Sequence, residues 1–184
     1  MARYFEQFPL MLYDIKANGY HKLVPDIFRR IKTKEKIKNN LTLLDVYDVE
    51  DGEKPEHVAY KIYGETDLFW VVCMINNIEN IYYDWPLSNL QFESYMKDKY
   101  DNPEAVHHYE RIQSSGPKIG DGPDDYSHMI GCNSTDAGAG PVTNFEYERR
   151  LQDNKRQVKI ISPDYLDIFL NEFSALIRKW YGTK

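Results

Sequence analysis

The chain has 184 residues, and a compact core of ~150 residues buries about 68–70% of its unfolded surface, so this length supports a stable fold without disulfides. Acidic residues outnumber basic ones by 29 to 23, and the net charge of −6 disfavours general phosphate binding, so neither DNA nor RNA is an expected partner. Two cysteines are too few for a disulfide framework, and no signal peptide is evident, so we expect a protein used without secretion in a reducing compartment.

The first forty residues, 1–40, are expected to form an arm with little core of its own. The arm begins in an extended conformation, turns at Asn18-Gly19 and continues as a short helix from about Pro25-Asp26. The basic run 32–38 is interrupted by Glu35 and Ile37, which favours a solvated helix face over a nucleic-acid contact. The large apolar residues of the arm are Phe5, Phe8, Ile27, Phe28 and Ile31.

Residues 41–103 are expected to be the folded centre. Val46, Tyr47 and Val49 predict a strand, and Asp51-Gly52 predicts a turn. A helix then begins at Pro55, which pre-sets φ for the first turn, and stops at Gly64.

A second helix of the centre is predicted to begin at Thr66 or Asp67. Its next eight residues are apolar all round, which is typical of a buried helix, but the run ends at Asn76-Asn77 and is too short to cross a membrane. Pro86 forces Trp85 into an extended conformation, and a further helix carries Leu90, Tyr95 and Met96 before Pro103 breaks it.

Residues 104–150 are expected to hold one strand, Val106 to Ile112, followed by a long loop or flexible arm from Gly116 to Pro141. That loop is crowded with Gly, Pro, Asp and Ser, and a loop of roughly 25 residues usually means function or disorder.

Residues 151–184 are expected to hold a strand, Val158 to Ile161, and an amphipathic helix. Ser162 is the predicted N-cap and Pro163 the first helical residue, and Gly182 ends the pattern. The apolar stripe either closes the protein's own core or packs into a helical bundle made by other chains. The stripe consists of Leu166, Phe169, Leu170, Phe173, Leu176, Ile177 and Trp180.

The patterns of catalysis and ligand binding are missing or incomplete. His107 and His108 are neighbours in a predicted strand and should point to opposite faces, so we expect no shared metal ion. The acidic run 121–125 lacks the order of a calcium loop, the glycines at 116–122 are not followed by Lys-Ser or Lys-Thr, and Cys132 with His128 has no orienting partner. We therefore predict no catalytic, cofactor-binding or metal-binding residue, and no enzyme.

The order strand, turn, helix, Gly, helix, Asn-Asn, Trp-Pro resembles the LysM module, a βααβ unit. The likeness lies in Asp51-Gly52-Glu53, in Ile62-Tyr63-Gly64 and in Asn76-Asn77-Ile78. LysM modules finish with a Gly-Gln-x-Leu-x-Ile-Pro type of strand, whereas this chain has Asp84 to Ser88 in that place. The expected fold class is therefore α+β, with a LysM-like βααβ centre, an N-terminal arm, a long Gly/Pro-rich loop and a C-terminal amphipathic helix.

A narrower resemblance is to the small baseplate wedge proteins of T4-type contractile-tailed bacteriophages, which carry a degenerate LysM-like middle. It covers most of the chain, in blocks at 26–30, 51–88, 106–110 and 142–148, with Lys155-Arg156 behind the last block. The resemblance implies a structural subunit of the virion tail, assembled in the host cytoplasm. Its implied partners are the larger wedge proteins of the core bundle, a small sheath-side wedge subunit and neighbouring wedges in a six-fold ring, without nucleic acid, membrane or small-molecule substrate.

Eight aromatic residues are the predicted partner-binding residues, because rigid rings carry a large share of interface energy. Each of them could instead belong to the core. The alternative function is a LysM-type peptidoglycan-binding protein whose groove lies between residues 51–55 and 76–83. The eight residues are Phe69, Trp70, Tyr82, Tyr83, Trp85, Phe169, Phe173 and Trp180.

Overall fold

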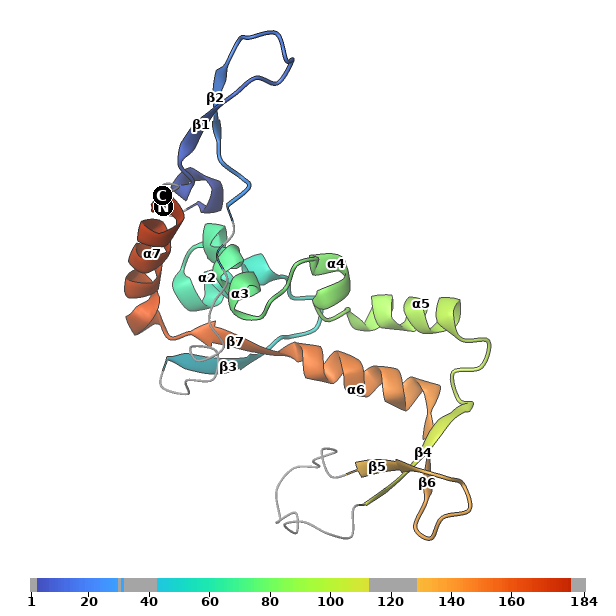
Figure 1. Cartoon of the computed structure of the whole chain (residues 1–184). Helices are drawn as coiled ribbons and strands as arrows, with labels where there is room; N and C mark the ends of the chain where they lie inside the picture. Colours follow the sequence, from blue (N-terminus) through green and yellow to red (C-terminus); the bar gives the residue numbers. More distant parts are fainter. Residues whose placement is uncertain (1–2, 30, 32–42, 113–128, 180–184) are drawn as a thin grey trace. The chain divides into compact units, whose positions relative to one another are not determined.

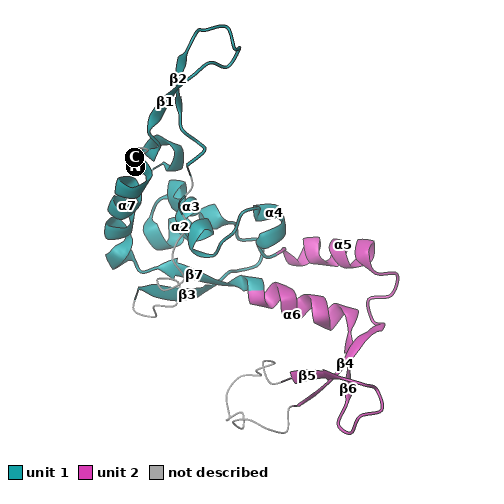
Figure 2. Ribbon diagram, viewed as in Figure 1, with its two compact units in different colours: residues 1–86, 155–184 teal, residues 87–154 magenta. Residues whose placement is uncertain are grey.

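The computed structural model describes residues 3–29, 31, 43–112 and 129–179, and it confirms the α+β class (Figure 1). The chain forms two compact units, one of residues 1–86 with 155–184 and the other of residues 87–154 (Figure 2). Trp180, the basic run 32–38, the acidic run 121–125 and His128 lie outside the described residues. Among the described helices, none has the length and apolar character needed to cross a bilayer.

The centre of the first unit follows the predicted order of strand, helix and helix. β3 (Leu44–Asp48) leads to α2 (Pro55–Tyr63), and then η2 (Thr66–Leu68) runs into α3 (Phe69–Ile75). Pro55 occupies the first turn of α2, and Gly64 ends the helix in the left-handed conformation at φ 75°. A residue with a Cβ is strained in that conformation, which explains the helix stop.

The departure from the LysM pattern at Asp84 to Ser88 contains no strand, so this segment does not supply the second strand of the expected βααβ centre. Residues Ile81–Asp84 form the short helix α4, and Trp85 is extended before Pro86 as predicted. The strand that pairs with β3 is instead β7 (Gln157–Ile161), antiparallel, with Val46 opposite Lys159. β7 pairs with β3 because its residues Val158, Ile160 and Ile161 are buried in the core. Asp84, in contrast, lies in a region of exposed side chains.

One apolar cluster fills the first unit. α7 (Pro163–Arg178) contributes Phe173 and Ile177, so the expectation that its stripe closes the protein's own core is confirmed for these two residues. The remaining buried members of the cluster are Phe8, Leu44, Val49, Val58, Ala59, Leu68, Trp70, Val71, Val72, Ile75, Trp85, Val158, Ile160 and Ile161.

The N-terminal region differs from the predicted arm. It contains the 3-10 helix η1 (Tyr4–Gln7) and a hairpin of β1 (Leu10–Tyr13) and β2 (Lys22–Pro25). The helix expected from Pro25-Asp26 is wrong, because Pro25 ends a strand and a turn follows it. Phe8 is buried, so the region does contribute to the core.

The second unit contains a helix pair and a three-stranded antiparallel sheet. Its helices are α5 (Asn89–Lys99) and α6 (Asn144–Arg156), and the last two residues of α6 belong to the first unit. The sheet has the order β5 (Met129–Cys132), β4 (Val106–Ile112), β6 (Gly140–Thr143). The long loop expected up to Pro141 is therefore wrong for residues 129–132 and 140–141, while residues 113–128 are not described.

Candidate interaction surfaces

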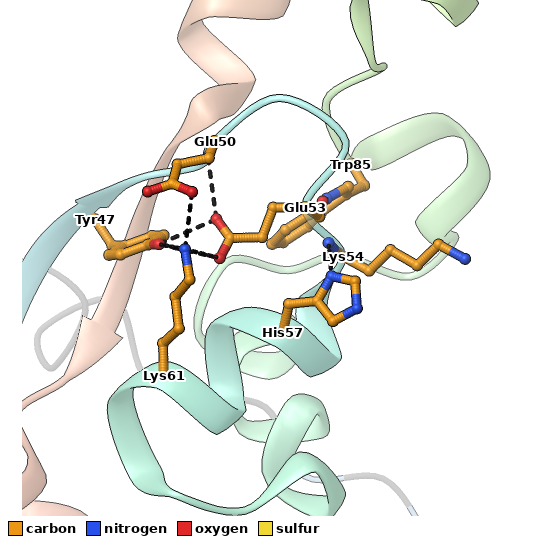
Figure 3. Close-up of polar contacts among 7 residues, drawn as sticks. All are labelled: Tyr47, Glu50, Glu53, Lys54, His57, Lys61 and Trp85. Carbon is orange, nitrogen blue, oxygen red and sulfur yellow. Dashed lines mark hydrogen bonds and ion pairs between the residues drawn. The ribbon is translucent and has the colours of Figure 1, made fainter.

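The loop between β3 and α2 is closed by a polar network around Glu53 (Figure 3). The buried carboxylate of Glu53 accepts hydrogen bonds from the Tyr47 hydroxyl at 3.0 Å and from the Glu50 amide at 3.0 Å, and it pairs with Lys61 at 2.9 Å. Burial alone would raise the pKa of Glu53, but the hydrogen bonds from Lys61, Glu50 and Tyr47 together hold it below its usual value. The carboxylate of Glu53 therefore has all of these partners within the protein.

Trp85 contacts one of the two loops, residues 51–55 and 76–83, that were predicted to line a sugar-binding groove. Its side chain is buried, and its indole Nε1 donates a hydrogen bond of 2.7 Å to the carbonyl of Glu53 (Figure 3). The ring and the N–H group are thus used inside the protein. In the described structure this leaves neither for a glycan.

A groove lies between η1, α3 and the start of α4. It has a volume of about 790 Å³, and its apolar lining includes Phe5, Phe69, Met74 and Ile78. Burial raises the pKa of the Cys73 thiol at the groove to about 11, which keeps it protonated near neutral pH and makes it a poor nucleophile. The other lining residues are Arg3, Tyr4, Glu6, Ile31, Asp67, Trp70, Asn77, Glu79 and Ile81.

Two tyrosines stand beside this groove on α4. Tyr82 and Tyr83 are 87% and 75% exposed, although Ile81, the residue before them, lines the groove. The backbone that carries them is fixed, because Asn80 caps the helix by accepting from the Tyr82 amide at 3.0 Å and Lys155 donates to the Tyr83 carbonyl at 2.6 Å. Large rings on a fixed backbone lose little entropy on binding, which favours contact with a partner.

Seven of the eight aromatic residues predicted to bind partners are described by the structure, and they fall into three groups. Trp70, Trp85 and Phe173 are buried, and the Trp70 and Phe173 rings are 4.7 Å apart, so the core alternative describes these three. Phe69 and Phe169 are half-buried at the edge of the same cluster. Of these seven described residues only Tyr82 and Tyr83 are exposed, and they remain the best candidates for a docking role.

Sequence reasoning missed the β1–β2 hairpin as a surface. Leu10, Leu12 and Leu23 are exposed although they belong to paired strands. The signal was present in the apolar run Leu10 to Tyr13, which is followed by the turn at Asn18-Gly19. Two strands joined by such a turn form a hairpin.

The second unit is tied by a buried carboxylate. Glu148 on α6 accepts from Lys99 at 2.7 Å and from Tyr100 at 2.9 Å through one oxygen, and from Tyr95 at 3.3 Å through the other. Burial alone would raise the pKa of Glu148, but the hydrogen bonds from Lys99 and Tyr100, with the charge of Lys99, hold it below its usual value. This arrangement joins α5 to α6, and both oxygens of the buried carboxylate have partners within the protein.

The histidine pair does not behave as predicted. His107 and His108 converge, with their Nδ1 atoms 2.8 Å apart. The reason is a register shift between Val106 and His108 in the pairing of β4 with β6, because a bulge removes the strict alternation of side chains. His108 contacts Glu110 at 2.8 Å and His107 stacks on Tyr147, and no cluster of three or more metal-ligating residues occurs in the described part of the chain.

Comparison with known proteins gives one consistent picture. The model of the family described as base plate wedge protein 53 matches residues 5–121. Baseplate wedge protein gp53 of Enterobacteria phage T4 is 27% identical to the chain over 178 residues, which cover 86% of this chain and 86% of the T4 protein. Both matches name a structural component of a tail baseplate, and neither supports the peptidoglycan-binding alternative.

Proposed function

The chain belongs to the base plate wedge protein 53 family of structural baseplate proteins, and we propose that it joins neighbouring wedge subunits through the groove between η1, α3 and α4 together with Tyr82 and Tyr83. It is a virion protein of the tail baseplate. The observation that carries the proposal is the pair of exposed tyrosines on a fixed backbone beside an apolar groove.

The groove and the tyrosine pair supply the two parts of an effective interface. Interface energy concentrates in a few large side chains that enter desolvated pockets, surrounded by a polar rim. The groove has an apolar floor of Phe69, Met74 and Ile78, and Tyr82 and Tyr83 lie next to it on α4. A partner that fills the groove with apolar side chains would therefore lie close to the helix that carries both tyrosines.

Charges at the rim of the groove indicate which charge a partner segment should carry. Among the described residues, Glu6, Asp67 and Glu79 line the groove with one cation, Arg3, which pairs with Asp67 at 3.1 Å and with Glu6 at 3.7 Å. The described part of the rim is therefore net acidic, like the whole chain at −6. The best-matched partner segment carries Lys or Arg beside its apolar anchors, since complementary charge gives specificity and speeds encounter.

The proposed partners are other wedge subunits. They comprise the larger wedge proteins that form the core bundle, the small sheath-side wedge subunit and adjacent wedges in the six-fold ring, met in the host cytoplasm as the tail assembles. Several contacts on one chain raise the effective concentration for each later contact, so a small subunit can hold a ring together.

The test replaces both tyrosines by alanine, Tyr82→Ala with Tyr83→Ala, in the full chain. Binding to the purified wedge proteins of the same phage is measured, and we expect an affinity at least about tenfold lower, as for a typical interface hot spot. The matched control is Tyr60→Ala on α2, since Tyr60 is also exposed but does not line the groove. Equal binding by the double variant and the control would contradict the proposal. Saturable binding of the unaltered chain to purified peptidoglycan would instead favour the sugar-binding alternative.

A further inference from the structure

One face of the β1–β2 hairpin is wholly apolar, and the other is apolar except for Lys22. Directly paired residues of antiparallel strands share a face. One face therefore carries Leu10, Leu12, Leu23 and Pro25, and the other carries Met11, Val24, Tyr13 and Lys22. Runs without polar alternation are typical of strands that are covered on both sides. Yet the side chains of Leu10, Leu12 and Leu23 are 63%, 64% and 66% exposed.

Both ends of the hairpin are fastened to α7. Before β1, Phe8 is buried, the Ser174 hydroxyl donates to the side-chain oxygen of Gln7, and Arg178 donates to the Gln7 carbonyl at 3.3 Å. After β2, Arg29 pairs with Asp26 at 2.8 Å and donates to the carbonyls of Ile177 at 2.9 Å and Lys179 at 3.1 Å. The base of the hairpin is therefore held by the last turn of α7, which satisfies carbonyls that the helix end leaves open.

The pattern of hydrogen bonds shows which backbone groups point outward. The Asp26 amide donates to the Pro9 carbonyl at 2.8 Å, so Pro9 and Asp26 are a hydrogen-bonded pair. Because such pairs alternate along an antiparallel ladder, the pairs Leu10 with Pro25 and Leu12 with Leu23 are not hydrogen-bonded to each other. The N–H and C=O groups of these four residues thus face the two outer edges.

The two outer edges differ. On β2, Pro25 has no N–H group, and its carbonyl already accepts from the Ile27 amide at 3.0 Å. Proline is a usual way to blunt an edge strand. On β1, Leu10 and Leu12 each present a complete N–H and C=O pair, and within the described part of the chain no further strand lies against them.

We propose that the outer edge of β1 receives an extended segment of another wedge protein, which pairs with the backbone of Leu10 and Leu12 and extends the hairpin to a three-stranded sheet. This is strand addition, in which backbone hydrogen bonds supply affinity and side chains supply specificity. The partner segment is uncharged and apolar on both faces, to match Leu10 to Tyr13. The inference rests on the proposed role in wedge assembly but concerns a surface separate from the groove.

Two other occupants fit the hairpin less well. A bilayer offers no hydrogen-bond partner to the outward groups of Leu10 and Leu12, and the tip carries Asp14, whose carboxylate accepts from the Gly19 amide at 2.6 Å. A different protein can add contacts on the hairpin faces beside its paired strand, whereas a second copy paired through β1 would bring its own four-residue edge alone and leave both faces open. That contact falls short of the ~1,200 Å² of total area typical of a stable interface.

The test compares Leu12→Pro with Leu23→Pro in the full chain. The two leucines face each other, have nearly equal exposure and lie on the same face, so both variants lose the same side chain. Each proline also removes an outward N–H group, but only Leu12→Pro removes one from the open edge. Affinity for the purified wedge proteins of the same phage is expected to fall at least about tenfold for Leu12→Pro and less than about threefold for Leu23→Pro.

Exchange protection of the Met11 and Val24 amides, which belong to a hydrogen-bonded pair, checks that the hairpin survives in each variant. Equal losses in the two variants, or no loss in either, would overturn strand addition at β1. A Leu12-dependent dimer of the free protein, or binding to lipid vesicles, would overturn the assigned partner. The variants leave Tyr82 and Tyr83 intact, so failure here with success of the tyrosine test rejects this inference and keeps the proposed function.

Discussion

The unit of residues 1–86 and 155–184 contains one cluster of buried apolar side chains, whereas the unit of residues 87–154 buries three apolar residues among those described, Phe92, Met96 and Val142. The second unit instead places Glu148 and Glu110 against cations. Lys99 pairs with Glu148 at 2.7 Å and Arg150 pairs with Glu110 at 2.7 Å. The first unit also has a buried carboxylate, Glu53 paired with Lys61, but its apolar cluster is much larger than the apolar core described in the second unit.

This difference predicts different responses to mutation and to pH. Apolar burial depends little on protonation, and a truncation in the core costs transfer energy plus the energy of a cavity. A buried carboxylate depends on its charge, and removing it leaves a cation with fewer partners. Each experiment below asks whether the two units differ in this way.

The largest effect is expected for Phe173→Ala in the apolar cluster. Phe173 is buried against Trp70, and removing a buried phenyl ring costs about 3–5 kcal/mol. Tryptophan fluorescence during urea unfolding checks this, because Trp70 and Trp85 both report on the first unit. Ile168→Ala is the matched control on the same helix, since Ile168 is exposed and its loss should cost less than about 0.5 kcal/mol.

The second effect is expected for Glu148→Gln in the other unit. Glutamine keeps the shape of the side chain but loses the charge that pairs with Lys99, and because Lys99 is partly exposed the cost should be about 1–3 kcal/mol. Hydrogen exchange of α5 and α6 measures it. The exposed residue Glu93 on α5 provides the control Glu93→Gln. Equal loss of protection in both variants would show that the buried carboxylate has no special role.

Acid should loosen the second unit before it unfolds the apolar cluster. The folded state holds the pKa values of Glu148 and Glu110 below the ordinary 4.5, so each carboxylate stabilises the fold above the pKa of the unfolded chain. That stability is lost as the pH falls through the lower folded value. Exchange protection of α5 and α6 should therefore fall below about pH 4.5, ahead of α3 and β7. Glu148→Gln should flatten this pH dependence, and an unchanged profile would contradict the assignment.

The smallest effect is expected for Gly64→Ala, which should cost about 1 kcal/mol because φ at this position is 75°. The comparison is Gly131→Ala in β5, where the backbone is not left-handed and an added Cβ meets open space. That substitution should be neutral or slightly stabilising. Thermal unfolding of both variants checks the pair, and a similar loss from each would show that backbone conformation is not the cause.

Local signals predicted the elements that local chemistry controls. Pro55 and Gly64 set the bounds of α2, Ser162-Pro163 set the start of α7, and Pro86 set the extended backbone of Trp85. Pairing between distant segments could not be read in this way. Nothing in Val46 itself identifies Lys159 as its neighbour, and the bulge that brings His107 to His108 depends on the register of β4 with β6.

The sequence predicted the residue types of the candidate site but not which of those residues are exposed. Aromatic residues were expected to bind partners, but the sequence does not distinguish a ring that fills the core, such as Trp70, from one that faces solvent, such as Tyr82. Exposure is decided by which helices pack over each ring. The hairpin was missed because its apolar runs were interpreted as an extended arm, although the turn at Asn18-Gly19 was predicted.

The pairing of β3 with β7 determines the order in which the two units can fold during synthesis. The whole second unit is translated between α3 and β7, so it can complete its own contacts while the first unit still lacks a strand and a helix. At ~5–20 residues per second, the wait from α3 to β7 lasts on the order of ten seconds. Throughout that interval the nascent chain carries the uncovered apolar residues of α3, and a ribosome that stops before Gln157 releases a polypeptide whose first unit cannot close.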